Sequence, residues 1–213
     1  MTGILLASRA GRRYLAVLGG FAALGALCSR YGFKLQFAPA HDAVVLAVPE
    51  MCAVFLAAAA LIVTRSRLWI IDRFGVRSRR WLPAIGAAVA VIAGPQLVLV
   101  AAVAAGVPEG TWPHAATSVL FLAALGVLVA PFAGTLRATW LMFGLELTLT
   151  VLAQLGPSIA AWSPLATIGW PSAGTVPVGR VGIAVLTTVA AFAVTVRTLG
   201  YSGPAWQRDH ASG

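Results

Sequence analysis

The sequence predicts an all-α, polytopic membrane protein with six transmembrane helices and both termini in the cytoplasm. The first observation is composition: 60% of the 213 residues are hydrophobic, 10% are charged, and the mean hydropathy is +0.90. A soluble domain carries about 25% charged residues. The second observation is a series of six long apolar stretches. The third is a basic cluster between the second and third stretches, which indicates their orientation.

Each apolar stretch approaches the length that a helix needs to cross the hydrocarbon core, which is about 20 residues. All six belong to one transmembrane domain over residues 1–213. The expected spans cover residues 14–29, 43–64, 82–105, 115–134, 138–155 and 181–199. The amino terminus resembles a signal peptide but lacks a small-x-small cleavage site, so we expect its apolar run to be the first helix.

The basic loop over residues 65–81, RSRLWIIDRFGVRSRRW, carries six of the fifteen Lys and Arg residues. Short basic loops beside membrane spans remain in the cytoplasm. In this orientation Arg30, Lys34 and Arg180 lie outside, and the other basic residues lie inside. We therefore expect a multi-pass protein of the plasma membrane. The excess of Arg over Lys and the many alanines indicate a GC-rich bacterial genome.

Two connections have contrasting characters. The connection between the fourth and fifth expected spans is tight, which predicts an antiparallel helical hairpin. Residues 156–179 form a long outer loop that is rich in Pro and Gly and still apolar. We expect this loop to return to the membrane surface as short interfacial or partly re-entrant helices, anchored by Trp162 and Trp170.

Helix packing is also readable from the sequence. In the third span, Gly86, Ala90 and Gly94 repeat every four residues and predict close approach by another helix. Pro95 and Pro131 each remove a backbone hydrogen bond and predict kinks.

The two cysteines are expected to be apolar packing residues. Cys28 falls near the outer end of the first expected span, whereas Cys52 falls well inside the second. We therefore expect no disulfide between them.

Two carboxylates fall within apolar spans, Glu50 in the second and Glu146 in the fifth. A charged side chain at the bilayer centre costs about 2.5 to 3.5 kcal/mol on insertion scales, so such residues face the bundle interior, a polar partner or water. One interpretation is a proton or cation site, or a polar contact with a transported compound. The other is a structural contact between helices. Gln96 is a third candidate for either role.

The sequence lacks the residues that most membrane enzymes need for catalysis. It has no HExxH, no paired-cysteine motif and no cluster of aspartates, and its three histidines fall in loops or tails. We expect no catalytic, metal or cofactor site. The sequence also lacks GxxxxGK[ST], so any ATP must act through a separate subunit. Nucleic acid is not an expected partner, because the basic residues flank apolar spans and are suited to lipid head groups.

The basic loop itself allows two interpretations. It forms either a short amphipathic helix that docks a cytoplasmic partner, or a loop held on anionic lipid. The candidate docking residues are Trp69, Asp72, Arg73, Phe74 and Arg77.

The layout resembles the membrane subunits of type-2 ABC exporters. That family has six helices, a cytoplasmic coupling helix between the second and third, and a long outer loop with short helices before the sixth. Residues 65–81 and 156–179 occupy the corresponding positions. The resemblance implies a separate P-loop ATPase, a second copy or similar membrane subunit, and export of a hydrophobic or amphipathic compound by alternating access. It places Glu146 and Gln96 along the pathway.

Two other functions remain open. The chain can instead be a non-transporting scaffold or assembly subunit, in which Glu50 and Glu146 are buried against partner helices. A proton-coupled carrier acting alone is less favoured, because the spans contain only two candidate carboxylates and no basic partner.

Overall fold

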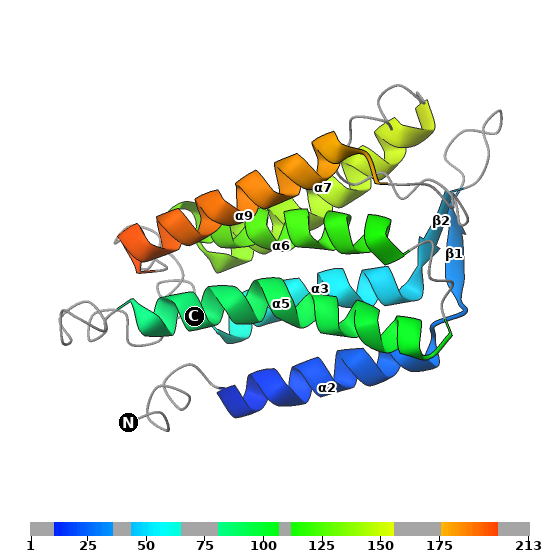
Figure 1. Cartoon of the computed structure of the whole chain (residues 1–213), viewed down its shortest axis with the longest axis horizontal. Helices are drawn as coiled ribbons and strands as arrows, with labels where there is room; N and C mark the ends of the chain where they lie inside the picture. The colour runs from blue at the N-terminus through cyan, green and yellow to red at the C-terminus, as the bar shows by residue number, and fades with distance from the viewer. Residues whose placement is uncertain (1–10, 36–43, 65–80, 107–111, 156–175, 200–213) are drawn as a thin grey trace.

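The computed structural model describes residues 11–35, 44–64, 81–106, 112–155 and 176–199. These residues form six helices and two short strands, arranged as a helical bundle with both strands at one end (Figure 1). We call this end the strand end. In chain order the elements are α2 (Gly11–Leu27), β1 (Gly32–Leu35), β2 (Val44–Ala47), α3 (Val48–Val63), α5 (Leu82–Ala104), α6 (Trp112–Ala133), α7 (Thr135–Leu155) and α9 (Val178–Thr198).

Three helices are long and apolar enough to cross a membrane: α5 with 23 residues, α6 with 22 and α9 with 21. The helix α3 is apolar but shorter, with 16 residues. The prediction of a helical, membrane-embedded protein is confirmed by these elements. The predicted outer loop lies almost entirely outside the described residues.

The prediction that the second span begins at residue 43 is wrong. Val44–Ala47 form β2, which pairs antiparallel with β1 so that Gly32 lies opposite Ala47 and Leu35 opposite Val44. The helix α3 begins only at Val48, with Pro49 in its first turn, where proline is tolerated because the N–H it lacks has no helical partner. A continuous apolar run does not by itself distinguish a strand from a helix, which explains the error.

The core of the bundle lies around α3, which packs against α2, α5, α6 and α7. Its alanines Ala53, Ala57 and Ala60 are completely buried. Small side chains let neighbouring backbones approach closely, which is how helices associate in lipid, where apolar surface gains little from leaving the solvent.

A tyrosine fixes α2 beside the proline of α5. The hydroxyl of Tyr14 donates a 2.7 Å hydrogen bond to the carbonyl oxygen of Ala90, and the phenol lies against Gly94. A side chain at Gly94 would occupy the space of the phenol, so the predicted close approach occurs at this glycine. At Gly86, by contrast, an added Cβ would meet nothing within 4 Å. The helix continues through Pro95.

The helices α6 and α7 form the predicted antiparallel hairpin. A single residue, Gly134, joins them with φ 91°, a conformation that other residues rarely adopt. Deeper in the bundle, Gly126 of α6 lies against Met142 of α7 and Leu61 of α3. Here the missing side chain lets three helices meet.

Hydroxyl side chains within the helices bond to their own backbone. Each donates to the carbonyl four residues earlier, which satisfies the hydroxyl hydrogen within its own helix. This group comprises Thr64, Thr117, Ser118, Thr139, Thr187, Thr188, Thr195 and Thr198.

The helix α9 packs through one narrow face. It contacts α6 and α5, and its buried residues include Ala184, Ala191 and Thr195, which recur at helical spacing. Its large apolar residues, such as Leu186 and Val189, are 70% and 60% exposed. In a bilayer this exposed face contacts lipid chains.

Replacing Gly126 with alanine should destabilise the bundle. Alanine is favoured over glycine in a helix by about 1 kcal/mol, but the new Cβ would lie 2.8 Å from Cδ1 of Leu61, and overpacking costs about 1 to 3 kcal/mol. We expect Gly126→Ala to lower the free energy of unfolding, measured by detergent titration in mixed micelles. Gly144→Ala is the matched control, because no atom lies within 4 Å of its added Cβ. Equal effects of the two substitutions would contradict this packing.

Candidate functional site

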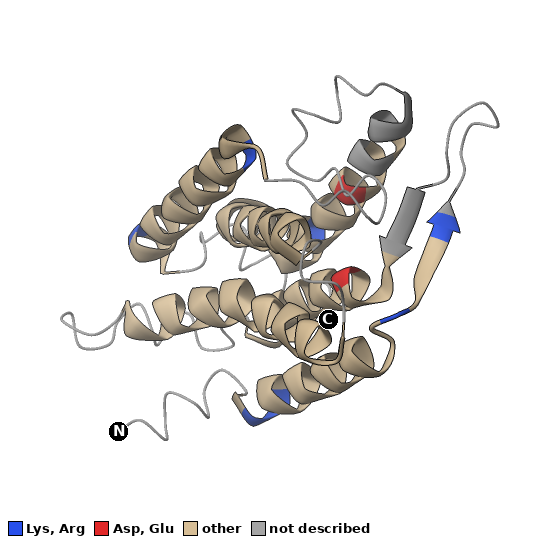
Figure 2. Cartoon of the chain, turned by 45° about the vertical axis from the view of Figure 1, so that its right-hand side comes forward, with Lys and Arg blue, Asp and Glu red and all other residues tan. Residues whose placement is uncertain are grey.

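The described residues contain two carboxylates, Glu50 on α3 and Glu146 on α7, shown in red in Figure 2. Both belong to helices of the bundle rather than to its connections. They lie far apart in the sequence, and only the packing of α7 against α3 brings their helices together.

Glu50 is the third residue of α3 and is only 4% exposed. A carboxylate near a helix amino terminus gains about 0.3 to 1 kcal/mol from the helix dipole, and up to about 2 kcal/mol when partly buried. Removing an ion from water costs several kcal/mol in a real protein. The burial cost is therefore larger than the dipole gain, and an ionised Glu50 needs a compensating group.

A contact between two aromatic rings shows where Glu146 lies relative to Glu50 along the helix axes. The rings of Phe55 on α3 and Phe143 on α7 have centroids 5.0 Å apart and are tilted by 46°. The two helices run antiparallel, since α3 begins and α7 ends toward the strand end (Figure 1). With a rise of 1.5 Å per residue, Glu50 lies about 7.5 Å and Glu146 about 4.5 Å from this aromatic pair, both toward the strand end.

The backbone positions of the two residues are consequently at similar depth, about 3 Å apart along the helix axes. They are close enough for their charges to repel each other. Glu146 is half-buried, so Glu50 is the more enclosed member of the pair. The sequence analysis identified both residues but did not bring them together.

The third candidate, Gln96, has a different environment. Its side-chain amide is half-buried and donates a 3.2 Å hydrogen bond to the carbonyl oxygen of Ala116 on α6. The contact links α5 to α6 directly after Pro95. Whether Gln96 also faces a pathway stays a prediction.

An open hollow of about 570 Å³ follows one face of α7. The described residues that line it recur at helical spacing and do not include Glu50, Gln96 or Glu146. They are Arg137, Trp140, Leu141, Gly144, Leu145 and Thr148. Its walls are mainly apolar, which suits a lipid chain or a hydrophobic compound.

The cysteines are closer together than the sequence analysis expected. Both thiols are free, and they lie within electrostatic range of each other. A Cβ added at Gly25 would lie 3.9 Å from the Cβ of Cys52, which places this part of α2 directly against the first turns of α3. The expected separation was wrong because α3 begins later than predicted, so Cys52 lies near the strand end.

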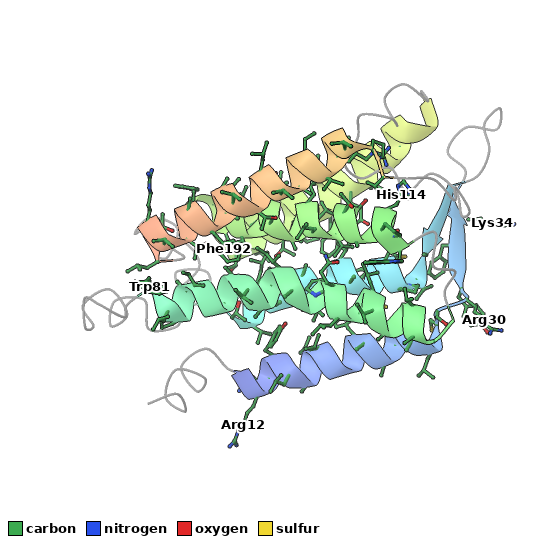
Figure 3. The ribbon with its side chains drawn as sticks, viewed as in Figure 1. Arg12, Arg30, Lys34, Trp81, His114 and Phe192 are labelled. Carbon is green, nitrogen blue, oxygen red and sulfur yellow. The ribbon has the colours of Figure 1, made fainter. Side chains whose placement is uncertain are left out.

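Basic residues lie toward both ends of the bundle (Figure 3). Arg12 and Arg13 begin α2, Arg137 begins α7 and Arg197 ends α9, all at the end opposite the strands. Arg30 and Lys34 lie at the strand end, as does Arg180. The sequence analysis missed the burial of Arg180, which lies in the first turn of α9 and is 8% exposed.

The candidate docking residues Trp69, Asp72, Arg73, Phe74 and Arg77 lie outside the described residues. Their loop joins the ends of α3 and α5 that are opposite the strand end. Across the described ranges, no group of three His, Cys, Asp or Glu side chains could hold a metal ion.

Comparisons with protein-family models, curated proteins and solved structures gave no match to this chain.

The contact that positions the two carboxylates can be tested by a double-mutant cycle. Phe55→Ala and Phe143→Ala should each destabilise the protein, and their effects should be coupled by about 0.5 to 1.5 kcal/mol, as for other aromatic pairs. The free energy of unfolding of both single variants and the double variant provides the measurement. Strictly additive effects would contradict the packing of α7 on α3 in this register.

Proposed function

We propose that this chain is the membrane subunit of an ATP-driven ABC exporter, which moves a hydrophobic or amphipathic compound and takes energy from a separate ATPase subunit. In this proposal all six described helices span a bacterial plasma membrane, and both termini are cytoplasmic. A second copy or a similar membrane subunit completes the transporter. The proposal has the same layout as the type-2 exporters that the sequence resembles.

The observation that carries the proposal is the position of the helices on either side of the basic loop. The loop follows α3 and precedes α5. The helix α3 contacts α2, α5, α6 and α7, while α5 contacts α2, α3, α6 and α9. Together these two helices touch every other described helix. A force applied to the loop by a docked ATPase would therefore act on the whole bundle.

The charge distribution supports the orientation. The end opposite the strands carries Arg12, Arg13, Arg137 and Arg197, and it is also the end to which the loop with six arginines connects. The positive-inside rule assigns this end to the cytoplasm and the strand end to the outside. The docking loop and the ATPase are then on the same side of the membrane.

Docking can be tested by purifying the tagged chain from its own host in mild detergent. We expect a P-loop ATPase to co-purify in stoichiometric amount. Arg73→Glu combined with Arg77→Glu should reduce the yield of the ATPase about tenfold or more, because like charges that meet across an interface cost several kcal/mol. Arg197→Glu is the control, since it changes a charge at the same end of the bundle but outside the loop. A stable complex without an ATPase would contradict the proposal and favour a scaffold.

The role of Glu146 separates a transporter from a scaffold. In inside-out vesicles, Glu146→Gln should slow the ATP-dependent movement of a fluorescent amphipathic dye severalfold while the subunits remain associated, because the substitution removes the charge but keeps the shape. Leu147→Val on the same helix is the control, since Leu147 is exposed and does not line the hollow along α7. Loss of the complex in Glu146→Gln, with transport tracking the amount of complex, would instead show an assembly role.

A further inference from the structure

The hollow along α7 supports an inference that rests on the membrane embedding of the bundle but does not depend on the exporter proposal. We propose that this hollow binds one anionic phospholipid, whose phosphate is held by Arg137 and whose acyl chain lies along the helix past Gly144.

The length of the hollow is the first support. The helix α7 packs against α6, which is apolar and long enough to cross a membrane, and Gly134 alone joins the two helices. The described residues that line the hollow extend from Arg137 to Thr148, about 16.5 Å along the axis at 1.5 Å per residue. One leaflet of the hydrocarbon core is about 15 Å thick, half of about 30 Å. The hollow therefore has the length that one acyl chain occupies in a bilayer.

The chemistry of the wall changes along this length. At the beginning of α7, Arg137 is exposed, and about one turn further Trp140 is 69% exposed. A guanidinium binds phosphate oxygens through two parallel N–H donors, and Trp favours the level of the lipid head groups. Beyond these two residues the wall consists of Leu141, Gly144 and Leu145, which carry no charge. A charged end followed by an apolar length matches the shape of a phospholipid.

The backbone of α7 itself is accessible at the middle of the hollow. A Cβ added at Gly144 would meet nothing within 4 Å, so an acyl chain can lie directly against the helix at this position. The volume of about 570 Å³ falls within the range of about 300 to 1,000 Å³ that is typical of small-molecule sites.

The charges of the described residues favour an anionic head group. The described carboxylates are Glu50, which begins α3 at the strand end, and Glu146, which lies nine residues beyond Arg137 and about 13.5 Å from it along the helix axis. Within the described ranges, no acidic group is thus placed to neutralise Arg137 or to bind an ammonium group beside it. A head group with a net negative charge, as in phosphatidylglycerol, is therefore favoured over the zwitterionic head group of phosphatidylethanolamine.

Lipid selection can be measured through the fluorescence of Trp140 in vesicles of phosphatidylethanolamine and phosphatidylglycerol that contain the full chain. One lipid or the other carries brominated acyl chains, which quench an indole on contact. Subtracting the signal of Trp140→Phe isolates Trp140 from the remaining tryptophans. We expect phosphatidylglycerol to bind at this site about fivefold more tightly than phosphatidylethanolamine, which corresponds to the effect of one arginine beside anionic lipid.

Two substitutions test the two parts of the site. Arg137→Gln should abolish the preference, because it removes the charge at the end of the hollow. Gly144→Leu should reduce the preference at least twofold, because the new side chain occupies the space of the acyl chain while Arg137 is retained. Arg197→Gln is the matched control and should leave the preference unchanged, since Arg197 is exposed at the same end of the bundle but does not line the hollow.

Circular dichroism and gel filtration establish that each variant is folded. Equal quenching of wild-type protein by the two brominated lipids would overturn the proposal. Equal losses in Arg137→Gln and Arg197→Gln would also overturn it, by showing a general attraction of anionic lipid to this end of the bundle. A preference that survives intact in Gly144→Leu would do the same for the acyl-chain site. The vesicles contain no ATPase, so failure of the exporter proposal would leave these results unaffected.

Discussion

The enclosure of α3 is the constraint on which the rest of the structure depends. Four helices pack around it, and they approach closely because its inward positions are filled by alanines such as Ala53, Ala57 and Ala60, which are completely buried. Lipid chains are as apolar as leucine, so contact between helices is driven by close packing rather than by exclusion of water. A larger residue at these positions would push the neighbouring helices away from α3 and loosen its packing against all four of them.

This enclosure also explains why a carboxyl at the beginning of α3 is unusual. Glu50 lies in the first turn of α3, directly after β2, and its side chain is buried. The same helix forms the centre of the core. A sequence that specifies one structure rarely buries a charge, and departures from that rule concentrate at functional sites. The contact between Phe55 and Phe143 holds α7, which carries the second carboxylate, against α3. One packing arrangement thus creates both the core and the candidate site.

The same arrangement relates the two ends of the molecule. The basic loop lies between α3 and α5, and the carboxylate pair lies toward the strand end of α3. A displacement of α3 produced at the loop would reach Glu50 through a continuous helix that packs against four others, because well-packed interiors transmit strain. The helix α3 therefore connects the carboxylate at one of its ends with the loop that follows its other end.

The sequence by itself determined the helical, membrane-embedded character of the chain, because the length and apolarity of its stretches depend only on local composition. It also identified Glu50 and Glu146 as costly residues in an apolar setting, and Gln96 as a third polar candidate. It did not determine that Val44–Ala47 form a strand, since an apolar run serves a strand or a helix equally well until a partner strand is present. The packing of α7 against α3, which brings the helices of Glu50 and Glu146 together, was decided only by the tertiary structure, because the packing of one helix on another depends on which small and aromatic side chains meet across the bundle.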